Sequence, residues 1–120
     1  MSTSVLILTY SFAGILIFAG IMHIIKPRVF KNFTPPFLPL KITNYAIGFI
    51  EFSLGVALLF KNTQKIGGIA IFILMLIFLP IHIWDATKLK PAIGSKTVAY
   101  IRIPIQFLLL YVAYLIYTNS

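Results

Sequence analysis

Seven side chains that could bind a ligand or move a proton interrupt the apolar runs of this 120-residue chain. They are His23, Asn44, Glu51, His82, Asp85, Arg102 and Gln106. Ionisable groups within a membrane span are costly to bury, so they are functional-site candidates by default. Imidazole and carboxylate groups can act as acids and bases, and amide and guanidinium groups can hold a polar ligand by hydrogen bonds. These side chains therefore indicate ligand binding or proton transfer.

Four apolar runs must position these side chains. They cover about residues 5–25, 43–60, 66–84 and 98–117. The chain is 60% hydrophobic and 10% charged, whereas a soluble domain is roughly half apolar and about a quarter charged. About 20 helical residues cross a ~30 Å hydrocarbon core. The runs therefore predict an all-α fold, a four-transmembrane-helix bundle that forms a single integral membrane domain of residues 1–120.

The polar side chains converge on one side of this predicted bundle. If all four runs cross the membrane, the ends of the first and third and the starts of the second and fourth share a face. The polar groups occupy those ends: His23 in the first run, Asn44 and Glu51 in the second, His82 and Asp85 in the third, and Arg102 and Gln106 in the fourth. The sequence therefore predicts a polar, ligand-binding pocket in one leaflet, opposite an aliphatic and aromatic leaflet.

The charge distribution predicts which side this is. The chain has 10 Lys and Arg against 2 Asp and Glu, a net charge of +8. Eight of the ten lie on the side of the pocket: Lys26, Arg28, Lys31, Lys41, Lys88, Lys90, Lys96 and Arg102. The positive-inside rule then places the first and third loops and the pocket in the cytoplasm, and both termini outside. We expect a bacterial inner (plasma) membrane protein that contacts anionic lipid head groups. Nucleic acid is not an expected partner, because no aromatic–basic interleaving is present.

The loop between the first two runs is proline-rich and amphipathic. Pro35, Pro36 and Pro39 forbid an ordinary helix there. We expect a short interfacial helix at Pro27–Phe33, followed by an extended segment on the bundle. The loop is either a connector that follows the membrane surface or a lid over the pocket.

Two pairs within the spans have specific alternatives. Glu51 and Arg102 enter from the same side, and Gln106 shares a helix face with Arg102. A Glu51–Arg102 bridge is expected, either to fix helix register or as part of a ligand or proton site. His82 and Asp85 are three residues apart, so the carboxylate can orient the imidazole, unless Asp85 is only an interfacial residue.

Several other chemistries find no support in the sequence. There is no cysteine, which excludes thiolate and Fe–S chemistry by this chain alone. Two histidines and two carboxylates lack a tight ligand spacing, so no metal site is predicted. No nucleotide-binding motif is present and no cofactor is identified. The first run is longer than the core of a secretory signal peptide and lacks its basic flank, so we interpret it as a span.

Four stretches, in order, resemble the DoxX-like family of small membrane proteins. They are Ala19–Pro39, with A-G-I-M-H and P-P-F-L-P; Gly48–Phe60, with its internal glutamate and glycines; Phe78–Ala86; and Arg102–Gln106. The resemblance implies a four-helix bundle, broadly similar to the sterol-isomerase and sigma-2-receptor type. It also implies a link of some relatives to thiosulfate:quinone oxidoreductase or other redox membrane complexes. Many members have an A-N pair where this chain has Ile81–His82, so the His82/Asp85 pair marks a subgroup.

Three classes of function follow. The first is a membrane protein that binds a small amphipathic or lipid-like ligand, such as a quinone, including as a subunit of a membrane redox complex. The second is an isomerase-like membrane enzyme that uses Glu51, His82 or Asp85 for proton transfer. The third is an assembly factor that acts on membrane proteins by helix contacts. A partner subunit or a homo-oligomer is compatible with each class.

Overall fold

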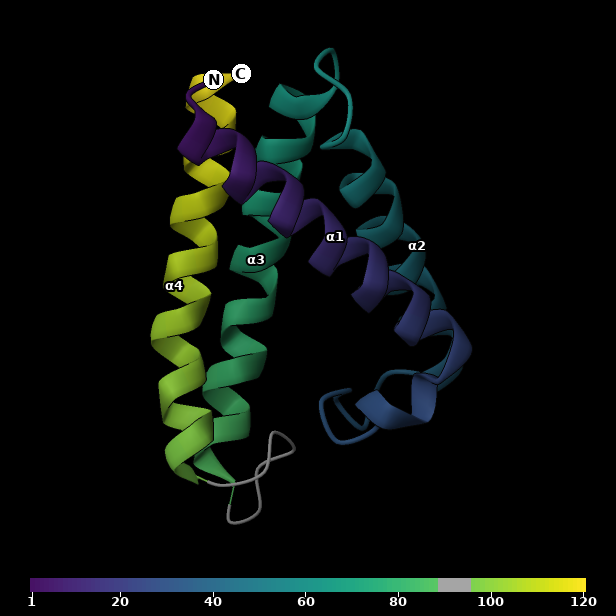
Figure 1. Ribbon diagram of the computed structural model, residues 1–120. Coiled ribbons are helices and arrows are strands. Elements are labelled where there is room, and N and C mark those ends of the chain that lie inside the picture. Colours follow the sequence, from purple (N-terminus) through teal and green to yellow (C-terminus); the bar gives the residue numbers. More distant parts are fainter. Residues whose placement is uncertain (89–95) are drawn as a thin grey trace.

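The computed structural model describes residues 1–88 and 96–120, and all regular structure in these ranges is helical (Figure 1). The elements are α1 (Thr3–Ile25), the 3-10 helix η1 (Pro27–Phe30), α2 (Leu40–Ala57), α3 (Gln64–Thr87) and α4 (Lys96–Asn119). Three of them, α1, α3 and α4, are long and apolar enough to cross a membrane. The all-α, four-helix prediction is thereby confirmed. Lys90, one of the eight clustered cations, lies outside the described residues.

The helix boundaries follow from local sequence. The Oγ atom of Ser2 accepts a hydrogen bond from the backbone N–H of Val5 at 3.3 Å and caps α1. Pro27 stands in the first turn of η1, where its missing N–H is not needed. Pro39 is extended, with φ −66° and ψ 124°, and directly precedes α2. Proline thus separates α1, η1 and α2, as the sequence indicated.

Helix α2 is shifted relative to its expected span of 43–60. It begins at Leu40, directly after Pro39, and ends at Ala57. The hydroxyl of Thr63 donates to the carbonyl oxygens of Ala57 and Phe60 and closes the tight turn into α3. With 18 residues, α2 is about 27 Å long, slightly short of a ~30 Å core. That α2 crosses the membrane stays a prediction.

The helices pair as two hairpins. Helix α1 packs mainly against α2, and α3 packs mainly against α4. The two hairpins lie close together at the end that carries both termini and the α2–α3 turn, and they diverge toward the end that carries η1 (Figure 1). This arrangement brings the end of α1 and the start of α2 to the same end as the last turns of α3 and the first turns of α4.

Glycines let α1 and α2 approach closely. A Cβ atom added to Gly20 would lie 2.6 Å from the carbonyl oxygen of Gly48, and one added to Gly48 would lie 2.6 Å from the carbonyl oxygen of Gly20. A Cβ atom on Gly55 would lie 2.9 Å from the carbonyl oxygen of Ala13. Gly48, Glu51 and Gly55 are all buried. The face of α2 that carries glycine, carboxylate and glycine therefore faces α1, as helix–helix packing of small residues requires.

The apolar core lies at the end with the termini and joins both hairpins. Its buried side chains are Phe12, Ala13, Leu16, Leu58, Ile71, Leu74, Met75, Leu110, Val112, Ala113 and Ile116. Outward positions are also apolar: Phe18 and Phe49 are each 68% exposed, and Ile66 is 71% exposed. Such an exterior is costly in water and suited to lipid.

The segment between α1 and α2, residues 26–39, is called the connector below. Its helical part is one 3-10 turn, Pro27–Phe30, rather than the expected helix over Pro27–Phe33. Hydrogen-bonded turns follow, in which the N–H groups of Phe33 and Thr34 both donate to the carbonyl of Phe30. The prolines at 35 and 36 prevent these turns from extending into a helix. That η1 lies at a membrane interface stays a prediction.

The glycine contact yields a first prediction. Replacement of Gly20 by alanine places a methyl group against backbone atoms that cannot rotate away. We expect a loss of about 1–3 kcal/mol in the free energy of unfolding, measured by denaturation in detergent micelles. The matched control is Gly14→Ala, in the same helix, where nothing lies within 4 Å of an added Cβ. Equal stability of the two variants would contradict the close approach of α1 and α2.

Candidate functional site

The seven polar side chains that the sequence singled out divide into two sets, one in each hairpin. The α1/α2 set consists of His23, Asn44 and Glu51. The α3/α4 set consists of His82, Asp85, Arg102 and Gln106. Five of the seven belong to the last turns of α1 or α3 or to the first two turns of α2 or α4, and Glu51 and Gln106 lie one turn deeper. The members of the α1/α2 set contact one another.

The α1/α2 set is a chain of polar contacts that ends at a buried carboxylate. The Nδ1 atom of His23 lies 2.8 Å from Oδ1 of Asn44, and its Nε2 lies 3.4 Å from Oε1 of Glu51. The Nδ2 group of Asn44 donates to Oγ1 of Thr34 at 3.1 Å and to the carbonyl oxygen of Leu40 at 2.8 Å. Asn44 is 1% exposed and Glu51 is 4% exposed. The ring of Phe30 stacks on that of His23, with 3.7 Å between centroids.

Glu51 is therefore paired with His23, and the expected Glu51–Arg102 bridge is wrong. The reason is the glycine contact between α1 and α2. His23 lies three residues after Gly20, and Glu51 lies three residues after Gly48. Because α1 and α2 run in opposite directions, His23 and Glu51 lie one turn to either side of the glycine contact, and the close approach of the two backbones lets their side chains reach each other. Arg102 belongs to the other hairpin, and α2 has few contacts with it.

The α3/α4 set leaves two buried polar atoms without a partner. Gln106 is fully buried, and its Nε2 donates to the carbonyl oxygen of Met75 at 2.8 Å. This carbonyl precedes that of Leu76, whose helical donor is removed by Pro80. Nη1 of Arg102 and Oε1 of Gln106, one helical turn apart, have no hydrogen-bond partner among the described residues. An unmet buried polar group costs about 1–3 kcal/mol, so this pair of atoms favours a polar guest.

The connector bridges the two hairpins. The ring of Phe33 meets that of His82 edge-on, with 5.8 Å between centroids. The Nζ group of Lys88, directly after α3, donates to the backbone carbonyl of Asn32. Nζ also lies 3.3 Å from Oδ1 of Asp85 and 3.9 Å from the centre of the Trp84 ring. Asp85 is thus a buried carboxylate that holds a lysine at the connector.

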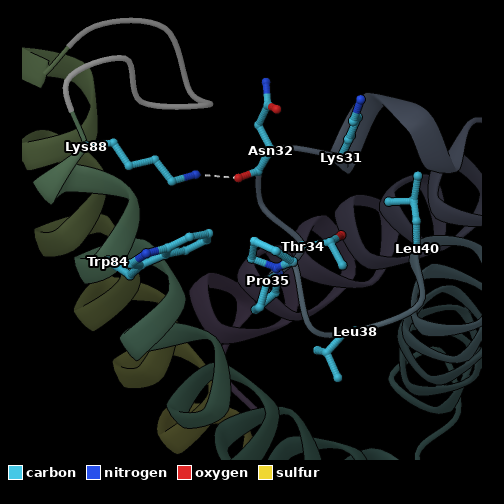
Figure 2. A pocket seen from close by; sticks show the side chains of 9 residues that line it. Lys31, Asn32, Thr34, Pro35, Leu38, Leu40, Trp84 and Lys88 are labelled. Carbon is cyan, nitrogen blue, oxygen red and sulfur yellow. Dashed lines mark hydrogen bonds between the residues drawn. The ribbon is translucent and has the colours of Figure 1, made fainter.

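A groove lies between the connector and the end of α3 (Figure 2). Its volume is about 630 Å³, and it is lined by Lys31, Asn32, Thr34, Pro35, Pro36, Leu38, Leu40, Trp84 and Lys88. None of the seven sequence-selected residues lines it. Some of its lining residues contact them, because Thr34 and Leu40 accept hydrogen bonds from Asn44, and Lys88 pairs with Asp85. Figure 2 shows Trp84 and Lys88 on one side and the connector on the other.

Sequence reasoning did not assign these lining residues to a site. A tryptophan near the end of a span is typical of an interface anchor, and Thr34 stands in an irregular loop. The available signals were the prolines that keep the connector on the bundle and the single tryptophan near two lysines. The loop that was expected to be either a membrane-surface connector or a lid forms one wall of the groove, and which of the two it is stays a prediction.

The model of one protein family, described as a domain of unknown function (DUF8561), matches residues 12–117. The chain belongs to this family. The match includes both polar sets and the whole connector, so the candidate site of this DUF8561 protein lies entirely within the family domain. No curated protein and no solved structure matches the chain.

The pairing in this DUF8561 protein yields a second prediction. In a double-mutant cycle with His23→Ala and Glu51→Ala, each single change leaves a buried polar partner behind. We therefore expect a coupling free energy above about 0.5 kcal/mol for this pair, measured by unfolding in micelles. The matched cycle with Glu51→Ala and Arg102→Ala should be additive within about 0.5 kcal/mol. Coupling in the second cycle alone would restore the Glu51–Arg102 bridge.

Proposed function

We propose that this protein is an integral membrane protein that binds a small amphipathic, lipid-like molecule at the groove. One observation carries the proposal: the groove lies between the two polar sets and touches both, through Thr34 and through Lys88. Polar residues of both hairpins thus contact the residues that line one groove. In this proposal the seven predicted residues do not line the groove, and they affect it through the lining residues that they contact.

The size and lining of the groove suit such a ligand. Ligand pockets usually measure about 300–1,000 Å³ and are apolar with a few polar groups, and this groove measures about 630 Å³. Pro35, Pro36, Leu38 and Trp84 offer apolar contact for a ring or a chain. Asn32, Thr34 and the two lysines offer hydrogen bonds to oxygen atoms.

A quinone is the leading candidate within this class. Its carbonyl oxygens accept hydrogen bonds, which lysine, asparagine and threonine side chains donate, and its ring can stack on an aromatic side chain such as Trp84. The unpartnered Nη1 of Arg102 is a further donor for an acceptor group that passes between the hairpins. The resemblance to DoxX-like proteins, and with it a role as a subunit of a membrane redox complex, is part of this proposal.

The second candidate is a membrane enzyme that transfers a proton to or from such a ligand. The observation that favours it is the buried contact between His23 and Glu51, which Asn44 orients from the opposite side of the ring. An imidazole held between an orienting group and a carboxylate is a common acid–base arrangement. In this proposal the acid–base pair is His23 and Glu51, so that Glu51 is retained from the expected residues Glu51, His82 and Asp85, and His23 is added.

We also propose a bacterial inner-membrane location in which the groove faces the cytoplasm. Both termini lie together at the opposite end of the bundle (Figure 1), where Lys61 and Lys65 are the only lysines among the described residues. The other described lysines and arginines lie toward the groove end. The positive-inside rule then supports external termini.

Ligand binding can be measured with the single tryptophan, Trp84, which lines the groove. We expect decylubiquinone to quench its fluorescence saturably, because a quinone in the groove would contact the indole ring. The matched control combines Trp84→Phe with Tyr10→Trp and moves the indole to a pocket at the opposite end. Simple partition of the quinone into the micelle would quench both proteins alike and without saturation, against the proposal. Native mass spectrometry of the purified protein identifies any other lipid-like molecule that stays bound.

Orientation can be tested by cysteine labelling, since the chain has no cysteine of its own. Asn32→Cys lies in the connector and Asn119→Cys at the end of α4. We expect an impermeant maleimide added to intact cells to label the cysteine at position 119 and not the one at position 32. The reverse pattern would place the groove outside the cell.

A further inference from the structure

The hydrogen bonds of Asn44 determine which nitrogen of His23 carries a proton. One side of the Asn44 amide lies 2.8 Å from the backbone carbonyl oxygen of Leu40, which can only accept. That side must therefore be the Nδ2 group, which donates. The other side is the oxygen, Oδ1, and it lies 2.8 Å from Nδ1 of His23. Because an amide oxygen only accepts, Nδ1 of His23 carries a hydrogen.

This assignment leaves Nε2 of His23 facing a carboxylate. A neutral imidazole with hydrogen on Nδ1 presents a lone pair at Nε2, and Oε1 of Glu51 lies 3.4 Å away. Two lone pairs facing each other in a buried place repel. One additional proton, on either Nε2 or the carboxyl group, turns the contact into an attraction. Both locations give the pair the same number of protons.

We propose that His23 and Glu51 form a proton-binding site, and that its occupancy controls the hydrogen bonds of Thr34 in the wall of the groove. The ligand of this site is a single proton, shared between Nε2 and Oε1. The connection to function rests on the proposed role of the groove, whereas the proton site itself does not.

No other charge substitutes for this proton among the described residues. The charged side chains closest along the chain on the elements around the pair are Lys26 after α1, Arg28 in η1 and Lys41 at the start of α2. None forms an ion pair with Glu51 in the described ranges, whereas His23 does. A carboxylate that is 4% exposed needs a proton or a cation nearby. The pair with His23 is what meets this need.

Loss of the proton would propagate to the groove. His23 would then turn to its other neutral form, with hydrogen on Nε2 toward Glu51 and a lone pair on Nδ1 toward Asn44. Asn44 would have to turn its amide so that Nδ2 faces His23 and Oδ1 faces Thr34, and its hydrogen bond to the carbonyl oxygen of Leu40 would be lost. The hydroxyl of Thr34, which now donates to the carbonyl of Phe30 at 3.0 Å, would donate to Asn44 instead. The turn after η1, and with it the connector wall, would lose one of its bonds.

The first experiment is nitrogen NMR of the protein with labelled histidine. The chain has only two histidines, so His82→Gln leaves His23 as the single signal. At neutral pH we expect a protonated Nδ1, together with either a protonated Nε2 or an infrared band of a protonated carboxyl group that disappears in Glu51→Gln. An unprotonated Nδ1, or an ionised Glu51 beside an unprotonated Nε2, would overturn the proton site.

The second experiment tests the connection to the groove without any ligand. As the pH is raised until the proton leaves, the hydrogen on His23 should move from Nδ1 to Nε2, and the emission of Trp84 should shift at the same pH. In Glu51→Gln, whose amide can donate to Nε2 without an ionisable proton, neither change should occur. A histidine transition with no change at Trp84 would overturn the connection. Failure of decylubiquinone to bind would count against the proposed function alone.

Discussion

The contact between Gly20 and Gly48 is the constraint on which the candidate site depends. It brings the backbones of α1 and α2 so close that neither position has room for a Cβ atom. The same approach lets the side chains of His23 and Glu51, which lie one turn to either side of the contact, reach each other. A buried carboxylate is tolerable only with such a partner. The packing of the two glycines thus determines which side chain pairs with the buried carboxylate of Glu51.

The two hairpins handle polar groups differently. In the α1/α2 hairpin, His23, Asn44 and Thr34 have partners that account for their donors and acceptors in sequence. In the α3/α4 hairpin, Arg102 and Gln106 each keep one buried atom without a partner. A complete set stabilises and orients, whereas an incomplete one favours a guest molecule. The groove contacts the complete set through Thr34 of the connector and the incomplete set through Lys88, which pairs with Asp85.

Depth in the bundle was predictable from the sequence, but direction around each helix was not. Hydropathy places His23, Glu51 and Arg102 at the same end, because position along a span follows from residue number. Which neighbour Glu51 meets depends on how α2 is rotated and on which helix it packs against. The available signal was the pair of glycines that share a helix face with Glu51, because small residues mark the side of α2 that packs closely against another helix. The groove was less accessible to prediction, since it is built from an irregular connector whose turns have no periodicity.

The apolar contacts between the two hairpins are concentrated at one end of the bundle. The core near the termini contains side chains from α1, α3 and α4 and from the end of α2, including Phe12, Leu58, Ile71 and Ile116. These contacts hold the two hairpins together at that end. At the far end, the contacts that join the hairpins among residues 1–88 and 96–120 include those of Lys88 with Asn32 and of Phe33 with His82. A small change in the angle between the hairpins at the packed end therefore displaces their residues most at the groove. Entry of a molecule wider than the groove therefore requires the release of a few peripheral contacts, while the packed core stays intact.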